Sequence, residues 1–303
     1  MDTGKVVIAG GSGLIGRALA AELAAAGREI VVLSRGRAEG LPGGARAVRW
    51  DGRTAEGWAG ELEGASAVVN LAGEGIAERR WSAARKRALL DSRLAATAAV
   101  VAGLAAARRR PPVLAQASAV GYYGDRGDEG LDEDSPPGIG FLSELADAWE
   151  RASAAADTLG VRRVLLRTGL VLAREGGALP AMARPFRLGV GGPLGDGRQW
   201  MPWIHVADQV GAIRFLIETA GAVGPFNLVA PAPETNAAFS RGLARALGRP
   251  CLLRAPGGAL RLALGEMAGM LLGGQRLRPR RLLDAGYRFR FPTLAGALAD
   301  LLA

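Results

Sequence analysis

The sequence predicts an α/β protein built on a doubly wound parallel sheet, with a smaller C-terminal α/β lobe. Two observations lead to this fold class. Short apolar, β-branched runs alternate with helical periodicities through about residue 170, and a glycine-rich turn joins the first run to the first helix. We expect the sheet domain to comprise residues 1–170 and about 203–230, and the C-terminal lobe to comprise residues 171–202 and 231–303.

The composition indicates a globular protein whose surface is rich in arginine. The chain has 303 residues, of which 49% are hydrophobic and 22% charged, so it can bury a large core and disorder is excluded. Its formal net charge of +9 comes from arginines scattered along the chain, since Lys5 and Lys86 are the only lysines. We therefore interpret the charge as a solvated surface and expect no nucleic-acid partner.

Cysteine and histidine are rare, and this limits the chemistry. Cys251 is the only cysteine and His205 the only histidine, which excludes an intramolecular disulfide and a His/Cys metal cluster and fits a reducing, cytoplasmic location. Only His205 has an ordinary pKa near neutrality, and we interpret it as a hydrogen-bonded structural residue at a loop-to-helix junction. No secretion signal precedes the first glycines. The apolar stretch 255–274 contains charged residues and several glycines, so we predict a core or groove helix and no membrane partner.

The chain begins with a strand, a glycine turn and a helix. Val6, Val7 and Ile8 form a buried parallel strand, and helical spacing of leucines starts just after the turn. Three glycines spaced three residues apart suit a pyrophosphate: the first permits a tight turn, the second lets backbone N–H groups approach the phosphates, and the third lets helix and strand pack closely. The residues expected to contact the cofactor here are Gly10, Ser12, Gly13, Leu14, Ile15 and Gly16.

The second predicted strand, Glu29–Ser34, indicates which dinucleotide binds. An acidic residue at the end of this strand would accept a hydrogen bond from the ribose 2′-hydroxyl of NAD, whereas an arginine accommodates the 2′-phosphate of NADP. Ser34 and Arg35 stand at this place, so we predict NADP(H) as the cofactor. The alternative interpretation of Arg35 is an ordinary surface arginine.

Two further strands bring residues to the same edge of the sheet. The third strand, Ala45–Trp50, ends at Asp51 and Gly52, where Asp51 is placed to accept a hydrogen bond from the adenine. The fourth strand is Ala67–Asn70. The turn after it is expected to face the nicotinamide half of the cofactor and comprises Leu71, Ala72, Gly73 and Glu74.

The rest of the sheet domain continues this alternation. We predict a helix from Arg79 to about Arg110, a strand over Pro112–Ala117, an acidic loop over 125–137, a helix over Phe141–Leu159 and a strand over Arg163–Thr168. The fifth strand leads directly to Ser118, and then to Tyr122 and Tyr123.

The C-terminal part is less periodic. Residues 169–197 are expected to be mostly loop, with 189–197 as a binding or lid loop. The segment Trp203–Asp208 starts a helix, Pro225–Val229 forms a strand, and Tyr287–Phe291 alternates like a short strand before a final helix.

Several of these motifs together resemble the extended short-chain dehydrogenase/reductase superfamily over the whole chain. They are Gly10–Gly16, Asn70–Gly73, Ser118 with Tyr122-Tyr123-Gly124, and Trp203–Asp208. Longer motifs are similar to its atypical "epimerase family" branch, which is also labelled nucleoside-diphosphate-sugar epimerase or SulA-type cell-division inhibitor: Leu71–Ile76, Arg80-Trp81, Asp91–Arg93, Ser118–Gly127, Gly192–Trp200, Gly274–Pro279 and Ala285–Pro292. The resemblance implies an NADP-binding Rossmann fold, a distinctive C-terminal domain, and a further cofactor contact from Arg79.

The sequence departs from that superfamily at its catalytic pair. A typical member uses a tyrosine as general acid/base, with a lysine four residues later that lowers the tyrosine pKa. The corresponding residues here are Leu142 and Ala146, which cannot move a proton. The candidate replacements are Ser118, Tyr122 and Tyr123. Each has a structural alternative, because Ser118 can satisfy backbone groups at a strand end and the tyrosines can pack beneath the nicotinamide, which is the interpretation we favour for them.

Two functions of different classes fit these observations. The first is an NADP(H)-binding epimerase or carbonyl reductase that acts on an unidentified small polar substrate without the Tyr–Lys pair. The second is a non-catalytic NADP(H)-binding regulatory protein whose occupancy reports redox state to a partner. A tyrosine without a neighbouring lysine stays protonated near neutral pH, so any activity should run as reduction of a carbonyl.

Overall fold

A computed structural model describes residues 4–36 and 40–303 of the chain. Seven parallel strands form one sheet in the order β11-β7-β5-β4-β1-β2-β3. Their bounds are Val6–Ala9 (β1), Ile30–Ser34 (β2), Arg46–Arg49 (β3), Ala67–Asn70 (β4), Val113–Ala119 (β5), Arg162–Thr168 (β7) and Gly224–Leu228 (β11). This is the Rossmann-type, doubly wound sheet that the sequence predicts, and the predicted fold class is confirmed.

The strand order reverses at β1, and this defines the edge where a ligand can bind. Strands β2 and β3 lie on one side of β1, whereas β4, β5, β7 and β11 lie on the other. Ala9 is level with Leu33 of β2 and with Asn70 of β4, so the three strands end together. The loops that leave β1 and β4 therefore meet at the carboxyl edge of the sheet, at the switch point where open α/β sheets bind ligands.

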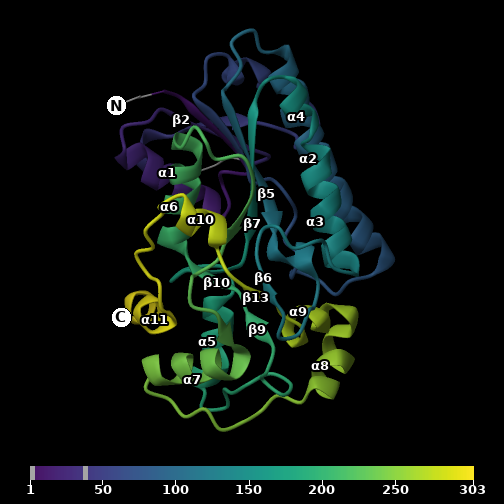
Figure 1. Cartoon of the computed structure of the whole chain (residues 1–303), viewed down its shortest axis with the longest axis vertical. Coiled ribbons are helices and arrows are strands. Elements are labelled where there is room, and N and C mark those ends of the chain that lie inside the picture. Colours follow the sequence, from purple (N-terminus) through teal and green to yellow (C-terminus); the bar gives the residue numbers. More distant parts are fainter. Residues whose placement is uncertain (1–3, 37–39) are drawn as a thin grey trace.

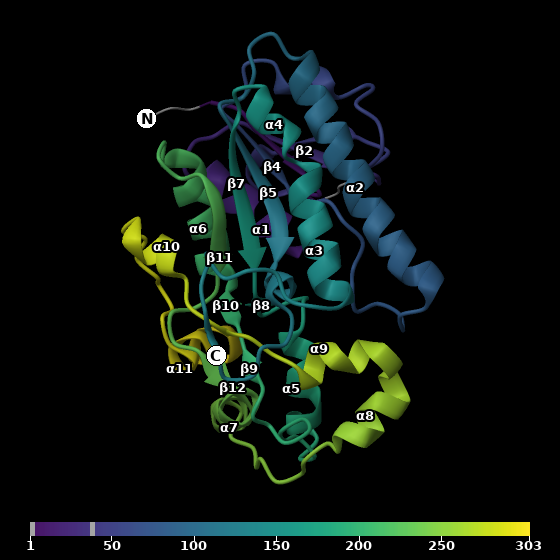
Figure 2. The same cartoon turned by 45° about the vertical axis from the view of Figure 1, so that its right-hand side comes forward.

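Helices cover both faces of the sheet, as Figures 1 and 2 show. Helices α1 (Leu14–Ala25) and α6 (Val206–Glu218) pack on one face, and α2 (Ala83–Ala106), α3 (Phe141–Ala152) and α4 (Ala155–Thr158) lie on the other. Successive side chains of a strand point to opposite faces. Val6 and Ile8 accordingly belong to the core under α1 and α6, and Val7 and Ala9 to the core under α2.

Helix α2 is the one helix in the described part of the chain with the length and apolar composition of a membrane span. Core helices share these properties, and α2 buries Leu89, Val100 and Leu104 completely. Val100 and Leu104 belong to the core beneath it, so its apolar side chains face the sheet. The helix starts at Ala83 rather than at the predicted Arg79, because the Ser82 hydroxyl accepts a hydrogen bond from the Arg85 N–H and caps the first turn.

The C-terminal lobe has a core of its own, in which α5, α7 and α11 pack around Trp203 and Phe239. Its helices are α5 (Leu179–Arg187), α7 (Asn236–Ala246), α8 (Gly257–Leu264), α9 (Gly269–Leu272), α10 (Arg280–Asp284) and α11 (Leu294–Leu302). Two short strand pairs join the lobe to the sheet domain: β8 (Leu170–Leu172) with β10 (Trp203–His205), and β6 (Gly130–Leu131) with β13 (Arg276–Leu277). A third pair, β9 (Trp200–Met201) with β12 (Glu234–Thr235), lies within the lobe. Short 3₁₀ turns are η1 (Pro42–Gly44), η2 (Ala59–Leu62), η3 (Val120–Tyr123) and η4 (Gly265–Ala268). We propose the predicted boundaries as the division between the two lobes.

The predicted strand over Tyr287–Phe291 is wrong. Its backbone N–H groups do not pair with another strand; instead, Arg290 N and Phe291 N donate to the carboxylate of Asp208 at 2.7 and 2.8 Å. The alternation of aromatic residues arises because they pack on a helix: Tyr287 contacts the ring of Phe215 on α6 at 5.5 Å between centroids.

Three other predicted elements need correction. The helix over 141–159 is broken at Ser153, whose hydroxyl donates to the carbonyl of Glu150 at 2.7 Å and so competes with the helical hydrogen bonds. The segment 169–197 is not mostly loop, since it contains β8 and α5, although 189–197 remains irregular. The stretch 255–274, predicted as one core or groove helix, forms three short elements, α8, η4 and α9, and no residue of α8 is buried.

Candidate functional site

The glycine loop after β1 is shaped by two glycines that the fold requires. Gly10 has φ +76°, and a Cβ there would lie 2.9 Å from backbone atoms of Leu71 and Ala72. A Cβ on Gly16 would lie 2.5 Å from the Cα of Gly11. The loop and α1 can approach the neighbouring strands this closely only because both residues lack a side chain.

Gly13 has a different environment. It is exposed, its φ of −77° and ψ of 176° are open to any residue, and a Cβ would meet only the carbonyl oxygen of Gly10 at 3.5 Å. The fold therefore does not require glycine here. A side chain at Gly13 would occupy the space in front of the N-terminus of α1. A glycine here therefore suits a loop that leaves this space free for a ligand.

The start of α1 offers donors for an anion. Gly13 occupies the N-cap position without a side-chain cap, and the first turn contains no acidic residue. Leu14 and Ile15 stand in this turn, where backbone N–H groups have no helical acceptor and the helix dipole favours negative charge. Beside them, the Ser34 hydroxyl donates to the Ser12 hydroxyl at 3.2 Å and fixes the loop against the end of β2.

The ends of β2 and β3 bring a cation and a carboxylate to the same edge. Arg35 is exposed, and a Cβ on Gly52 would lie 3.6 Å from its Cδ, so Arg35 and the turn after β3 are neighbours. The Asp51 carboxylate accepts hydrogen bonds from Arg53 N and Thr54 N at 2.7 and 2.9 Å, and these bonds hold its pKa below the ordinary value. Asp51 therefore closes its own turn while its side chain stays exposed.

The turn after β4 is held by arginines that the sequence analysis did not assign. The Ala72 N–H donates to Asn70 Oδ1 at 3.2 Å, and this bond fixes the path of Leu71 and Ala72 at the end of β4. Arg85 forms an ion pair with Glu74. Arg93 is buried, donates to the Glu74 carbonyl at 3.1 Å, and lies over the Trp149 ring at 4.9 Å.

The arginines at the turn after β4 are not the one predicted from the family resemblance, which was Arg79. Burial lowers the pKa of Arg93 to about 10. A Cβ on Gly73 would come within 3.3 Å of the Arg93 side chain. Arg79, the arginine expected here, is exposed and forms no hydrogen bond or ion pair with another described residue. Thus Arg93 and Arg85 shape the turn, and Arg79 stays a predicted contact.

A buried ion pair lies beneath the candidate catalytic residues. The Ser118 hydroxyl donates to Glu150 Oε1 at 2.6 Å, and the same carboxylate accepts two hydrogen bonds from the Arg167 guanidinium at 2.8 and 2.9 Å. All three residues are more than nine-tenths buried. Ser118 therefore has a structural role, but its hydroxyl bonds a buried carboxylate and not the backbone groups at the strand end that the sequence alternative named.

The two tyrosines differ sharply in accessibility. Tyr123 is fully buried, and its hydroxyl accepts from Arg167 at 2.9 Å and donates to Asn227 Oδ1 at 2.7 Å. Burial raises its pKa, so it stays a phenol. Tyr122 is only half-buried, and the Arg167 guanidinium lies over its ring at 3.5 Å. Of the three candidate donors, Tyr122 alone reaches the surface at this edge.

The positions of the missing catalytic pair lie on α3 beside these residues. Ala146 is buried, and Leu142 lies against Gly121, where a Cβ on the glycine would be 3.1 Å from the leucine Cβ. Leu142 fills space next to η3, which carries Tyr122, and Ala146 is buried in the core of the protein. At the two positions where a typical superfamily member has its catalytic tyrosine and lysine, this chain thus has apolar side chains that only pack.

His205 is a structural residue, as the sequence analysis expected. It is buried, its Nδ1 accepts a hydrogen bond from Ala207 N at 3.0 Å at the start of α6, and its ring stacks on Phe291 at 3.8 Å. The other ring nitrogen lies 3.1 Å from Asp300 Oδ2. Burial lowers the pKa of His205, so it is neutral near pH 7.

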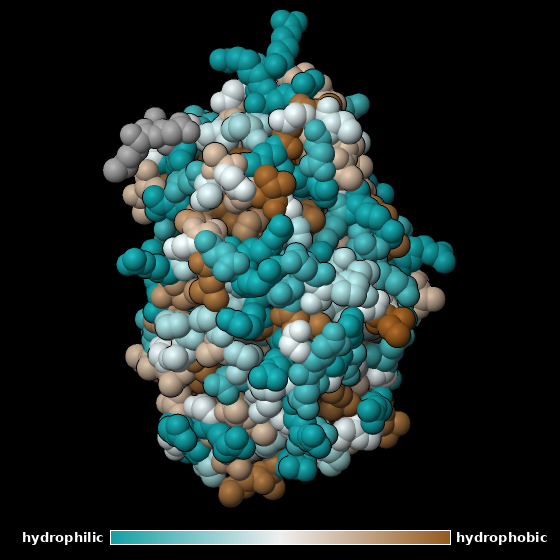
Figure 3. Space-filling model, in the orientation of Figure 1, coloured by the Kyte–Doolittle hydropathy of each residue, from teal (hydrophilic) through white to brown (hydrophobic). Residues whose placement is uncertain are grey.

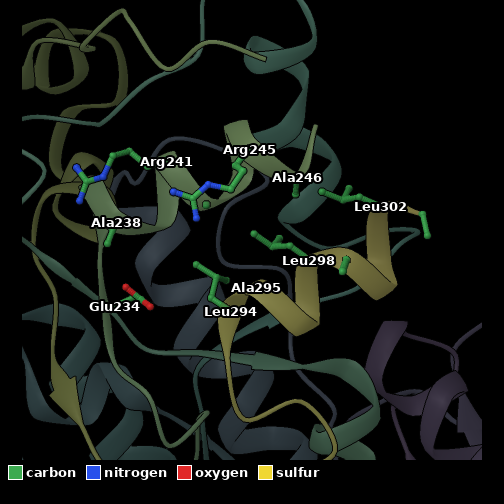
Figure 4. Close-up of a pocket in the computed structure, with 12 residues that line it drawn as sticks. Glu234, Ala238, Arg241, Arg245, Ala246, Leu294, Ala295, Leu298 and Leu302 are labelled. Atoms are coloured by element: carbon green, nitrogen blue, oxygen red, sulfur yellow. The ribbon is translucent and has the colours of Figure 1, made fainter. Parts of the chain in front are cut away.

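A groove of about 480 Å³ lies elsewhere, between α7 and α11 of the C-terminal lobe (Figure 4). Arg241 and Arg245 line it on one side and Leu294 and Leu298 on the other. None of the residues predicted to bind the cofactor or to act in catalysis contributes to it. The groove is therefore distinct from the candidate site at the edge of the sheet.

Sequence reasoning missed Arg85, Arg93, Arg167 and Asn227. A signal was present for Arg167, because a charged residue inside the apolar strand that ends at Thr168 has to find a buried partner. Arg93 lies in a motif that carried the family resemblance, but nothing in its spacing indicates that it folds back to the turn after β4.

Comparisons with known proteins cover almost the whole chain. The profile of the NAD dependent epimerase/dehydratase family matches residues 6–229, and that of a domain of unknown function, DUF1731, matches residues 255–301. The epimerase family protein SDR39U1 of Bos taurus is 42% identical to this chain over an aligned length of 304 residues, and the alignment covers 99% of this chain and 100% of the relative. The epimerase family protein MT2273 of Mycobacterium tuberculosis is 44% identical over 300 residues, 98% of this chain and 97% of the relative.

A solved structure is similar over the same length. The crystal structure of the human epimerase family protein SDR39U1 (isoform 2) with NADPH superposes on this chain with a TM-score of 0.88 at 37% sequence identity. The superposition covers 98% of this chain and 99% of the human chain. The likeness therefore includes both the sheet domain and the C-terminal lobe.

Proposed function

The chain belongs to the NAD dependent epimerase/dehydratase family, and on that premise we propose that it binds NADPH at the carboxyl edge of its sheet and reduces a carbonyl group of a small polar substrate. The observation that carries the proposal is the open cradle at Gly13, next to an exposed arginine at the end of β2. The human relative that superposes on this chain was crystallised with NADPH, which supports the same cofactor here.

The residues at this edge fit the parts of the dinucleotide. We assign the pyrophosphate to the N–H groups around Gly13, Leu14 and Ile15, where the chain supplies no anion of its own. Arg35 takes the 2′-phosphate as a charge-assisted contact. The turn after β3, at Asp51 and Gly52, faces the adenine, and the turn that includes Glu74 faces the nicotinamide half.

Bound NADPH supplies a hydride, so the protein has to supply a proton to the developing alkoxide. We assign this proton to the Tyr122 hydroxyl. Burial raises the pKa of Tyr122, although the Arg167 guanidinium over its ring acts in the opposite direction, so the phenol is protonated near neutral pH. Because Tyr122 is half-exposed, water restores its proton after each turnover.

The buried ion pair positions this donor. Glu150 holds the Arg167 guanidinium with two hydrogen bonds, and the guanidinium in turn supports the Tyr122 ring. A protonated tyrosine without a neighbouring lysine is a good acid toward an alkoxide and a poor base toward an alcohol. The arrangement therefore favours reduction over the oxidation step with which an epimerase begins.

The test is NADPH oxidation with a panel of aldehydes and ketones, comparing the unmodified protein with Tyr122→Phe. We expect slow turnover of at least one carbonyl, and a loss of about 10²-fold or more in kcat for the variant, with little change in the affinity for NADPH. Tyr287→Phe is the matched control, because it also deletes a phenol hydroxyl, but one that bonds Asp208 and none of Ser118, Glu150 and Arg167. Full activity of Tyr122→Phe refutes the assigned donor.

A second function is favoured by a specific observation. The hydroxyls of Ser118 and Tyr123 are buried within the protein, and Leu142 and Ala146 replace the usual pair, so most of the chemistry of the superfamily is missing. A regulatory protein that binds NADPH without turnover needs none of it. Stoichiometric NADPH binding without oxidation by any carbonyl of the panel selects this function.

The location and partners expected from the sequence remain predictions. The single cysteine and the absence of a metal-binding His/Cys set fit the cytoplasm. The scatter of arginines still argues against a nucleic-acid partner.

A further inference from the structure

The large apolar side chains that the described residues expose are concentrated in one part of the C-terminal lobe. Nine large apolar residues are exposed in the described part of the chain, and six of them lie in two segments, 188–190 and 252–271. Four of these six are more than half exposed and lie close in sequence to the place where the two segments meet. Their exposed fractions are 69% for Leu188, 53% for Val190, 77% for Leu252 and 55% for Leu253. We call these four residues the lobe-end apolar surface.

The two segments run side by side. Ala255 N donates to the Pro193 carbonyl and Gly195 N donates to the Ala255 carbonyl, both at 2.9 Å. A Cβ on Gly192 would lie 1.7 Å from the Leu253 carbonyl oxygen, so the chain after α5 is pressed against the chain before α8. Figure 3 shows hydrophobic residues projecting at the lower end of the molecule, where the connection between α7 and α8 runs in Figure 1.

The same segments are strongly basic. There is no acidic residue between Glu175 and Asp196, or between Glu234 and Glu266. The arginines closest in sequence to the lobe-end apolar surface are all exposed, and within residues 4–36 and 40–303 none of them forms an ion pair; they are Arg184, Arg187, Arg249 and Arg254. Elsewhere on the molecule, exposed arginines commonly pair with carboxylates, as Arg280 does with Asp132 and Asp134.

We propose that the lobe-end apolar surface docks on an anionic lipid bilayer. Exposed apolar patches of soluble proteins mark sites of protein or membrane interaction. Here the charge selects the bilayer: leucines enter the headgroup region and arginines lie along the surface, where lipid phosphates neutralise them. Residues 188–195 and 249–255 contain no carboxylate that would repel the phosphates. Helix α8 follows directly and contributes Leu262, which is 84% exposed, and Arg261 to the same basic segment.

This surface differs from a membrane span. The sequence expectation of no membrane partner considered only whether a segment could cross the bilayer, and residues 255–274 cannot. Peripheral docking needs no such segment. It needs apolar and basic side chains from two separate parts of the chain to be exposed together, which only the folded lobe shows.

The experiment is co-sedimentation of the full chain with vesicles. Vesicles of phosphatidylcholine alone are compared with vesicles of phosphatidylcholine and phosphatidylglycerol in a 3:1 ratio, at low and at high salt. We expect binding to the anionic vesicles only, weakened by salt because surface charges are screened. The double variant Leu252→Ser/Leu253→Ser should lower the partition coefficient about tenfold or more, and Arg254→Gln about fivefold.

The matched control is the double variant Val223→Ser/Leu283→Ser. These two residues are also exposed apolar side chains, at 56% and 37%, but they lie on a surface where Arg280 is paired with acidic residues. The control should bind like the unmodified protein. Leu188→Ser/Val190→Ser gives an independent test of the second segment.

Two results overturn the proposal. One is equal binding to anionic vesicles by Leu252→Ser/Leu253→Ser and the unmodified protein. The other is the absence of binding to anionic vesicles; if analytical ultracentrifugation then shows a concentration-dependent dimer that the same variant abolishes, the surface is an interface between two copies of this chain. Circular dichroism of each variant checks the fold, which substitutions at exposed residues should not change.

Discussion

The glycine loop allows binding and folding to be separated with two substitutions. Gly13→Val should abolish NADPH binding in a protein that still folds. At Gly13 a side chain meets no atom closer than the Gly10 carbonyl at 3.5 Å, and the extended backbone suits any residue. Replacing an N-cap glycine with a non-capping residue costs about 1 kcal/mol or less.

The effect on binding should be much larger. The valine occupies the space assigned to the pyrophosphate, so the NADPH affinity should fall by about 10²-fold or more, equivalent to roughly 2.8 kcal/mol. Gly16→Ala is the counterpart. Its Cβ would lie 2.5 Å from the Gly11 Cα and 2.7 Å from the Gly10 oxygen, both backbone atoms that cannot move aside. We expect a loss of stability of about 1–3 kcal/mol or more from overpacking.

The assay combines two measurements on each variant. Titration of NADPH fluorescence gives the affinity, and urea unfolding gives the free energy of unfolding. Gly13→Ala serves as a graded control, since its methyl group intrudes less than the valine side chain. The reasoning is refuted if folded Gly13→Val binds NADPH as tightly as the unmodified protein.

Two further predictions concern charge. We expect NADPH to bind about tenfold or more tightly than NADH, because Arg35 contributes a charge-assisted contact worth about 1.5–3 kcal/mol. Arg35→Ala should remove most of that preference in parallel fluorescence titrations. Equal affinities of the unmodified protein for both cofactors would contradict the assignment of Arg35. Burial lowers the pKa of His205 in the folded protein, whereas in the unfolded chain it has its ordinary value near 6.5. Between these two pKa values the unfolded chain binds more protons than the folded protein, so the free energy of unfolding decreases as the pH falls through this window. His205→Asn keeps an acceptor for Ala207 N and should flatten the decrease in unfolding free energy between pH 7.5 and 5; an unchanged slope in urea titrations contradicts the interpretation.

The sequence was most informative where local pattern and tertiary position coincide. The strands Val6–Ala9, Ile30–Ser34 and Ala67–Asn70 are buried throughout because both faces of the sheet are covered, and only Ser34 and Asn70 at their ends are polar. They could therefore be located from their apolar composition. The turns that follow them had to meet at one edge, because parallel strands joined by helices end on the same side. Because the strands could be located and their turns share one edge, the sequence also predicts where the cofactor contacts lie.

The sequence was least informative where a residue acts at a distance. The alternation Tyr287–Phe291 is typical of a strand, but its N–H groups are used by Asp208, about eighty residues earlier in the chain. Arg167 and Glu150 pair across elements, and only the fold shows that the pair supports Tyr122 and consumes the Ser118 hydroxyl. Long-range partners of this kind carry no local periodicity.

The contact of Asp208 with the C-terminal segment has a consequence for cooperativity. Asp208 is fully buried at the start of α6, and its carboxylate is satisfied by Arg290 N, Phe291 N and the Tyr287 hydroxyl. If the terminal segment detached alone, a buried carboxylate would lose its donors at a cost of several kcal/mol. The sheet and residues 287–303 should therefore unfold as one unit, and the amide protons of residues 290 and 291 should exchange with solvent about as slowly as those of the central strands.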